Sequence, residues 1–326
     1  MAVGAYAVAS DTGRKRRRNE DNYVVAPPVF AVADGMGGAQ AGEVASKLAA
    51  STLENGEDAG ELRGVDRVAA LIQEANRRVY DRATTDPAAS GMGTTMTVAV
   101  VEGMNVVIGH VGDSRAYLVR QGRMEQLTDD HSLVNELLKS GKLSPEEALS
   151  HPQRSVITRA VGTDPDVDID AFTIDAHDGD VFLLCSDGLT DMVGDEDILD
   201  VVDSHRDDLD RAVRLLVAAA NRGGGEDNIT AVAFRVAPGP ASDETLQLPS
   251  QSEPDEETME ANPPAVDTMV IPPDRIDREL LEPGSTEVRG AAGRDPLDKN
   301  ARARLVLTMV GLLAIATALL VWGLLH

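Results

Sequence analysis

This sequence is poor in cysteine, in aromatic residues and in positive charge. Its 326 residues include one cysteine and one tryptophan, and aromatic residues make up 3%. The single Cys185 excludes a disulfide within the chain and any cysteine-rich zinc site. It ends the apolar run 181–185 and is predicted to be a small core residue. Lysine and arginine total 30 against 55 acidic residues, a formal net charge of −25, which argues against a nucleic-acid-binding protein.

The composition divides the chain into parts. Residues 1–236 are predicted to be globular, because eight of the nine aromatic residues lie there. Residues 237–300 hold ten of the sixteen prolines, no aromatic residue and acidic runs such as Glu253-Pro254-Asp255-Glu256-Glu257. Such a segment cannot bury enough apolar surface to offset the entropy of ordering it. We therefore predict a disordered linker over 237–300.

The C-terminal segment has the properties of a membrane anchor. Residues 305–325 form an uncharged stretch of 21 residues, about 30 Å long as a helix. Arg302 and Arg304 precede it, and Trp322 lies near its end. We predict a single transmembrane helix, with the preceding chain on the cytoplasmic side of the cell membrane; the alternative is a buried core helix. The first ten residues lack the basic and apolar regions of a secretory signal.

Strand and helix patterns within the globular part come in groups. Strands are predicted at 2–9, 23–26, 29–33, 94–101, 105–111, 116–120, 168–174, 180–185 and 229–236. Helical spacing of apolar residues predicts helices around 68–79 and 209–220. Residues 132–155 predict two short helices around Gly141 that are poorly suited to a core. Grouped strands and grouped helices favour an α+β sandwich over strict alternation.

Acidic motifs recur beside these predicted strands. They are Arg16-Arg17-Arg18-Asn19-Glu20-Asp21, Asp34-Gly35-Met36-Gly37-Gly38, Gly112-Asp113-Ser114-Arg115, Ser186-Asp187-Gly188-Leu189 and Glu226-Asp227-Asn228. Asp34 and Asp187 follow strands, and Asp227 precedes one. If those strands are neighbours, three carboxylates converge and must take up protons or bind cations. Taken alone, Asp34 could instead cap the following helix.

Oxygen ligands of this kind suit Mg²⁺ or Mn²⁺. Two such ions can activate water and hold a phosphoryl group for in-line attack. The phosphate would need its own cation, for which an arginine fork is suited.

In order and spacing, the motifs resemble the metal-dependent protein phosphatase family (type 2C, specific for phosphoserine and phosphothreonine) in its compact bacterial form. The resemblance covers about residues 2–236. It implies a four-layer α-β-β-α sandwich, in which two sheets are flanked by helices. It also implies a binuclear Mn²⁺ or Mg²⁺ site at one end of the sandwich.

The resemblance further implies how the metal ions are held. Asp34 would bridge the two ions, and the Gly35 carbonyl would bind one of them. Asp187 and Asp227 would hold the other. Glu20 would bind a metal directly or through water.

Further roles follow from the same resemblance. Asp21 would order water at the metal ions, and Arg16 would bind the substrate phosphate. The other bases of the run 14–18 could shift that last assignment by a few residues, and the whole run could instead be a solvated loop. Asp113, with the metal ligand Asp187, matches a third and weaker metal site, to which Ser155 could contribute.

Two features concern substrate access and proton donation. Residues 132–155 would form a flap beside the active site. Some relatives carry a histidine as general acid where this chain has Met36, so another group must protonate the leaving oxygen. His131 is a candidate by proximity to the flap, although a structural turn histidine is the simpler interpretation.

These features predict an enzyme that hydrolyses phosphoserine and phosphothreonine on proteins. A catalytically inactive phosphoprotein-binding scaffold is the alternative, and the presence of Asp34, Asp187 and Asp227 argues against it. A regulator of anti-sigma-type factors is a third option, but no sensory domain is visible. The predicted partners are phosphorylated proteins, membrane Ser/Thr kinases and their substrates among them, together with membrane lipid and no nucleic acid.

Overall fold

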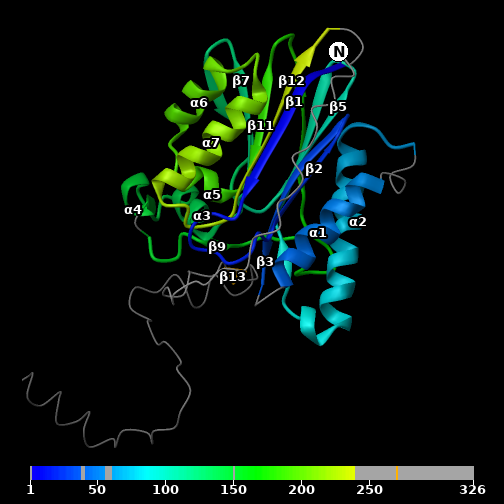
Figure 1. Cartoon of the computed structure of the whole chain (residues 1–326). Coiled ribbons are helices and arrows are strands. Elements are labelled where there is room, and N and C mark those ends of the chain that lie inside the picture. Colours follow the sequence, from blue (N-terminus) through cyan, green and yellow to red (C-terminus); the bar gives the residue numbers. More distant parts are fainter. Residues whose placement is uncertain (1, 38–40, 56–60, 150, 239–268, 271–326) are drawn as a thin grey trace, which may run out of the picture. The chain divides into compact units, whose positions relative to one another are not determined.

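Two antiparallel β-sheets face each other in the computed structural model, which describes residues 2–37, 41–55, 61–149, 151–238 and 269–270 (Figure 1). The first sheet has the strand order β1 (Ala2–Asp11), β12 (Ile229–Ala237), β11 (Val181–Cys185), β7 (Arg115–Arg120) and β8 (Arg123–Gln126). The second has the order β10 (Asp170–Asp175), β6 (Asn105–Val111), β5 (Met96–Glu102), β3 (Val29–Met36) and β2 (Asp21–Ala26), and the short β4 (Gly93–Thr94) pairs with β3.

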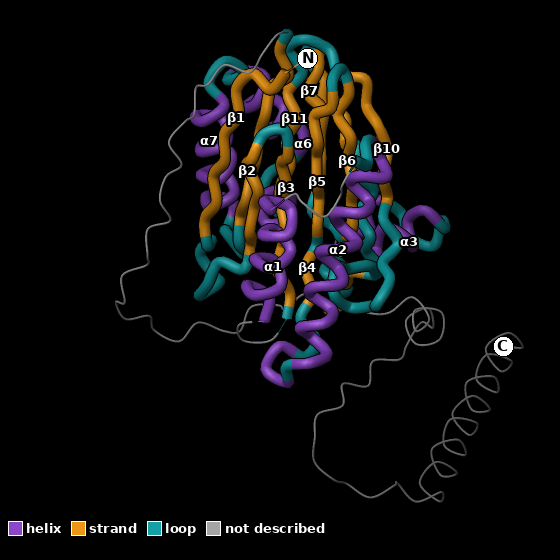
Figure 2. Tube along the Cα trace, turned by 90° about the vertical axis from the view of Figure 1, so that its right-hand side faces the viewer, coloured by secondary structure: helices purple, strands orange, loops and turns teal. Residues whose placement is uncertain are grey.

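Helices cover the outer face of each sheet. Figure 2 shows α1 (Ala41–Asn55) and α2 (Gly64–Thr85) in front of the second sheet. On the outer face of the first sheet lie α5 (Asp187–Thr190), α6 (Asp195–Ser204) and α7 (Leu209–Gly223) (Figure 1). The described residues therefore form the α-β-β-α layers that the motif resemblance implies, and the predicted grouping of strands and helices is confirmed.

Strand β3 shows how the sequence pattern builds these layers. Its residues alternate between two cores, as a period of two requires. Val29 and Ala31 join the core under α1 and α2. Phe30 and Val32 join the core between the sheets. There Phe30 stacks on Phe234 with ring centroids 4.3 Å apart, so the few aromatic residues are concentrated where they bury most area.

The flap region is better packed than the sequence predicts. It contains α3 (Leu133–Lys139), α4 (Pro145–Leu149) and, just beyond it, β9 (Val156–Ile157). Leu133, Leu137 and Val156 form a small apolar cluster of their own. Strand β9 also pairs in parallel with β13 (Met269–Val270). The expectation that these helices are poorly suited to a core was therefore wrong in part.

Other differences concern the ends of elements. Strand β3 continues through Met36, whereas the sequence predicts its end before Asp34. Asp34 consequently lies inside the strand, directly opposite Asp21 of β2. Strand β8 and helices α5 and α6 were not predicted, because their sequences are short or rich in charge.

The predicted linker and membrane helix fall mostly beyond this part of the chain. Of residues 237–300, only 237, 238, 269 and 270 are described, and the predicted helix 305–325 lies outside the described residues. Among the described helices, none combines the length and the apolar character needed to cross a bilayer.

Candidate metal centre

Five aspartates from separate elements come together in what we call the acidic cluster. Asp21 lies on β2, Asp34 on β3, Asp113 in the turn between β6 and β7, Asp187 at the start of α5, and Asp227 just before β12. The pKa of Asp34 is raised well above its usual value, first by burial and then by the negative charges of the other four. The structure thus brings together the aspartates that the motifs singled out.

Neighbouring hydroxyl groups hold this cluster in place. Ser186, which precedes Asp187, donates from Oγ to Asp21 Oδ2 at 2.8 Å and accepts the backbone N–H of Thr230 at 3.0 Å. The backbone N–H of Asp34 donates to Thr95 Oγ1 at 2.9 Å. These bonds join both sheets at the cluster, so its carboxylates are aimed by rigid elements.

The donor set fits hard divalent cations. Asp21 Oδ1 and Asp187 Oδ1 are buried without a hydrogen-bond partner among the described residues. Burial raises the pKa of Asp21 to about 6, and burial followed by the charge of Asp113 raises the pKa of Asp187 well above its usual value. Buried oxygens of this kind are costly unless a cation or proton compensates them. Among the described residues, no three acidic, histidine or cysteine side chains already surround a single point at metal-binding distance. Carbonyl and water ligands, which Mg²⁺ commonly keeps, would therefore complete each coordination shell.

A second group of oxygens converges at Gly42, near the start of α1. A methyl group on Gly42 would lie 2.5 Å from Glu20 Oε2 and 2.7 Å from the Gly35 carbonyl oxygen. Both oxygens therefore face one small space that only glycine leaves open. The Gly35 N–H in turn donates to the Glu20 carbonyl at 3.2 Å. This geometry is suited to the predicted ligand roles of Glu20 and Gly35.

Of the five bases at 14–18, Arg16 is the one that reaches the acidic cluster. Its Nη2 donates to Asp227 Oδ2 at 2.8 Å, and both side chains are largely buried. Arg14 instead donates from Nε to the Asn221 carbonyl at 2.8 Å, and Arg18 lies 3.8 Å from Glu43. Arg16 is therefore the base best placed for the predicted phosphate contact.

A cavity of about 380 Å³ adjoins the cluster under the flap. Asp113, Asp187, Asp191 and Ser155 line it together with flap residues. Burial, followed by the charge of Asp130, raises the pKa of Asp113 to about 7. The predicted weaker metal site of Asp113 and Asp187 thus has an acidic lining, and Ser155 lines the same cavity.

His131 is held as a structural residue. It is 7% exposed, and its Nδ1 accepts the Gly112 N–H at 3.0 Å. Its Nε2 lies 3.1 Å from both Asp170 and Arg159. Burial, followed by the positive charge of Arg159, lowers its pKa. With both ring nitrogens engaged in these contacts, His131 is unsuited to the proton-donor role considered for it.

Two site residues were missed by the sequence analysis. Asn228 accepts the Glu20 N–H at 2.8 Å and donates to the carbonyls of Thr12 and Arg18, which fixes the loop that carries Arg16. Asp191 adds a fourth carboxylate near Asp187; its side chain is 44% exposed, and partial desolvation raises its pKa. The sequence does contain a signal for Asp191, because it lies four residues after Asp187 and residues i and i+4 share a helix face.

Fold and site together define a class of protein. Converging carboxylates beside an arginine are typical of metal-dependent phosphoryl-transfer enzymes. Residues 15–222 match the family model described as Protein phosphatase 2C. Serine/threonine phosphatase stp of Listeria welshimeri is 40% identical over 231 residues, which cover 68% of this chain and 91% of that protein. The chain belongs to the protein phosphatase 2C family.

Relatives of known structure agree. The crystal structure of the Mycobacterium tuberculosis serine/threonine phosphatase PstP/Ppp is 38% identical with a TM-score of 0.68, and covers 72% of this chain and 99% of that one. The catalytic domain of PstP in complex with two manganese ions is 36% identical with a TM-score of 0.66, covering 73% and 100%. The family expected from the motifs is confirmed. The two crystallised chains consist almost entirely of the matched part, so in these relatives that part folds on its own.

Proposed function

We propose that the acidic cluster, with Glu20, Gly35 and Arg16, is the active site with which this chain hydrolyses phosphoserine and phosphothreonine in proteins. The chain is a metal-dependent protein serine/threonine phosphatase that uses Mn²⁺ or Mg²⁺. The observation that carries the assignment of the site is the position of the partly buried Asp34 among four other aspartates, whose charges raise its pKa after the effect of desolvation. A catalytically inactive scaffold is disfavoured, because it has no need of such a costly cluster and because the relatives are named as phosphatases.

Each residue has a distinct role in this proposal. Asp34 would bridge two metal ions, with Glu20 and the Gly35 carbonyl on one side and Asp187 and Asp227 on the other. When bound, the ions supply charge neutralisation and activate water for in-line attack on phosphorus.

The remaining residues position the reactants. The guanidinium of Arg16 orients the phosphate through two parallel hydrogen bonds. Asp21, itself held by Ser186, orients water at the site. Met36 is 5% exposed, packs with Ile157 and Ala160 and carries no acidic proton. The proton for the leaving oxygen therefore comes from water or from another group.

The direct test is phosphate release from a phosphothreonine peptide by residues 1–238. We expect turnover with Mn²⁺ or Mg²⁺ and its loss in EDTA, because the cluster alone has no nucleophile. Restoring Mn²⁺ to the chelated sample should restore turnover. A folded domain that binds the peptide but releases no phosphate with either metal would favour the scaffold.

We also propose that the phosphatase works at the inner face of the cell membrane. The uncharged stretch 305–325 and its basic flank support this localisation. A linker of 64 residues has a mean reach of about 45 Å as a flexible chain. Membrane-bound Ser/Thr kinases and their substrates are then the partners within reach.

Deletion of residues 301–326 tests this localisation. We expect it to leave turnover of a soluble phosphopeptide unchanged but to lower dephosphorylation of a membrane-embedded phosphorylated kinase in the same vesicles. Dephosphorylation of the kinase should slow because the deletion variant is no longer concentrated at the membrane surface. Full-length chain and deletion variant should be compared at equal activity on the peptide. An equal rate on the membrane kinase would contradict the proposal.

A further inference from the structure

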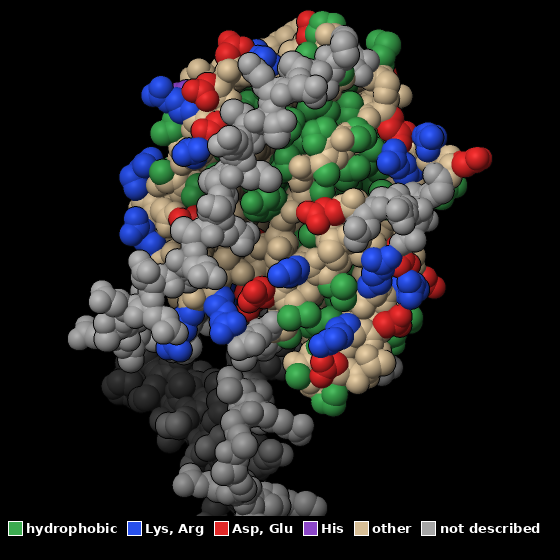
Figure 3. Space-filling model, turned by 45° about the vertical axis from the view of Figure 1, so that its right-hand side comes forward, with side chains coloured by type: hydrophobic (Ala, Val, Ile, Leu, Met, Phe, Trp, Pro, Cys, Tyr) green, Lys and Arg blue, Asp and Glu red, His purple; other side chains and the backbone are tan. Residues whose placement is uncertain are grey.

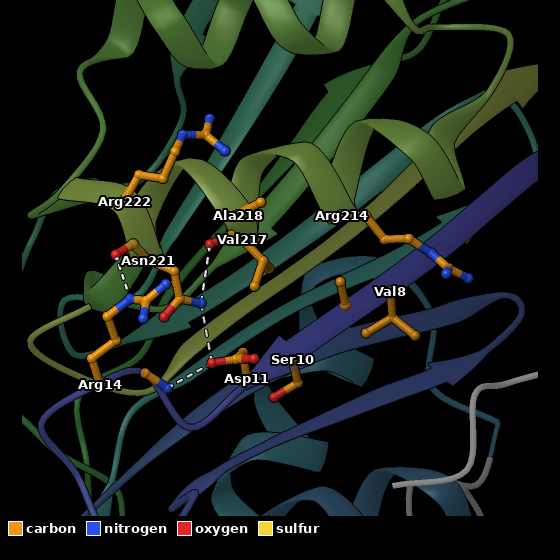
Figure 4. A pocket seen from close by; sticks show the side chains of 11 residues that line it. Val8, Ser10, Asp11, Arg14, Arg214, Val217, Ala218, Asn221 and Arg222 are labelled. Carbon is orange, nitrogen blue, oxygen red and sulfur yellow. Dashed lines mark hydrogen bonds between the residues drawn. The ribbon is translucent and has the colours of Figure 1, made fainter. Parts of the chain in front are cut away.

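A second cavity, of about 700 Å³, lies on the other side of the loop that carries Arg16. It is lined by the end of β1, the loop after it and residues of α7 between Arg214 and Arg222 (Figure 4). Three arginines, Arg14, Arg214 and Arg222, are among the residues that line it, and Asp11 is the one acidic residue of the lining (Figure 4). We call this cavity the arginine pocket. No step of the phosphatase reaction uses it.

The charge of the arginine pocket is unusual in a chain with a net charge of −25. Asp11 is engaged by neutral groups, the Gly13 N–H at 2.8 Å and Asn221 Nδ2 at 3.1 Å. Arg214 pairs with Asp210 at 3.0 Å. Within the described part of the chain, neither Arg14 nor Arg222 has a carboxylate partner, and both are exposed. On the face drawn in Figure 3, by contrast, basic side chains are interspersed with acidic ones.

The arginine pocket and the acidic cluster share the same two loops. The Arg14 N–H donates to the Gly225 carbonyl at 2.7 Å, and Asp227, two residues further on, binds Arg16 at 2.8 Å. Two residues span at most about 7 Å. A phosphopeptide with its phosphate at Arg16 therefore passes the pocket within a few residues of the phosphorylated one.

An extended peptide also finds backbone partners there. Strand β1 is at the edge of its sheet, and its residues Val8 to Asp11 line the pocket. Edge strands offer free N–H and C=O groups to an added strand. A peptide along β1 would present alternate side chains to the arginines.

We propose that the arginine pocket binds an anionic side chain of the phosphoprotein substrate, a carboxylate or a second phosphate, two to four residues from the phosphate that is hydrolysed. Arg14 and Arg222 supply unpaired guanidinium N–H groups, which suit both anions. The inference rests on the phosphatase function and adds a sequence preference to it. Substrates with acidic or multiply phosphorylated flanks are then preferred over neutral ones.

The test compares three phosphothreonine peptides of equal length with residues 1–238 and Mn²⁺. One has neutral flanks, one has glutamates two to four residues away, and one has a second phosphothreonine there. We expect kcat/KM to be about tenfold higher for one or both anionic peptides, and the preference to fall with added salt. The peptide with the higher kcat/KM shows whether the pocket prefers a carboxylate or a phosphate. Equal kcat/KM for all three would overturn the proposal.

The double variant Arg14→Gln/Arg222→Gln should remove this preference. We expect it to keep wild-type turnover of the neutral peptide and of p-nitrophenyl phosphate, which do not reach the pocket. Arg211→Gln, an exposed arginine of the same helix outside the pocket lining, is the matched control and should keep the preference. A preference retained in the double variant would contradict the assignment. If the wild type turned over none of these substrates, the result would instead count against the phosphatase function itself.

Comparing residues 1–238 with the full chain shows whether the anion in the pocket comes from the substrate or from the chain itself. The acidic run 253–257 of the same chain is a competing ligand for the arginines by charge. If residues 1–238 show the preference and the full chain shows none, that run occupies the pocket, and the assignment to substrate is wrong. An equal preference in both supports the substrate.

Discussion

Replacing Asp34 by asparagine should lower kcat/KM for a phosphothreonine peptide by about 10²–10³-fold or more, while making the metal-free domain more stable. Activity falls because asparagine cannot supply the negative charge that two metal ions share. Stability rises because desolvation and then the charges of four other aspartates raise the pKa of the partly buried Asp34 well above its usual value. The free energy of unfolding of the metal-free variant at neutral pH should therefore exceed that of the wild type.

The matched control is Asp180→Asn, which alters a buried carboxylate remote from the cluster. Asp180 is 2% exposed and forms a two-point ion pair with Arg120 at 2.6 and 2.8 Å. Its replacement should lower the free energy of unfolding by about 1–3 kcal/mol and leave kcat/KM of the folded enzyme unchanged. Urea unfolding in EDTA and phosphate release in Mn²⁺ measure the two quantities. If Asp34→Asn destabilised the metal-free domain as Asp180→Asn does, Asp34 would be a structural residue.

The sequence was sufficient to place most of the acidic cluster. Asp187 and Asp227 adjoin short apolar runs, and β11 and β12 are adjacent strands in the structure. Local pattern placed each carboxylate beside a strand, and the resemblance to the phosphatase family supplied the expectation that these carboxylates meet at one site. The membrane helix predicted at 305–325 stays a prediction of the same local kind, because it rests on hydropathy and flanking charge alone.

What the sequence did not predict depends on register and on distant contacts. The pairing of Asp21 with Asp34 follows from the alignment of β2 on β3, and a shift of one residue would separate them. Asn228 acts on Thr12 and Arg18, more than 200 residues away in the chain. The arginine pocket joins β1 to α7 in the same way. Local periodicity carries no information on such contacts.

The stability of the metal-free domain should fall as pH rises from about 4 to 7. Folding raises the pKa of Asp21 to about 6 and that of Asp113 to about 7, from 3.8 for both in the unfolded chain. Between these values the folded state holds protons that the unfolded state has released. Each group therefore lowers the free energy of unfolding by about 1.4 kcal/mol per pH unit until the pH passes its folded pKa. The expected loss is on the order of several kcal/mol, opposite to ordinary acid denaturation.

Urea unfolding of residues 1–238 without metal, at pH values from 4.5 to 8, measures this slope. The variant Asp21→Asn/Asp113→Asn is the control, because neither amide titrates, and its stability should change less over the same range. Mn²⁺ should stabilise the wild type more at pH 8 than at pH 5, since binding requires deprotonated carboxylates. A wild-type slope equal to that of the variant would show that the two carboxyls keep ordinary pKa values. The cluster would then be hydrated in the metal-free domain, with no buried charge for a metal ion to compensate.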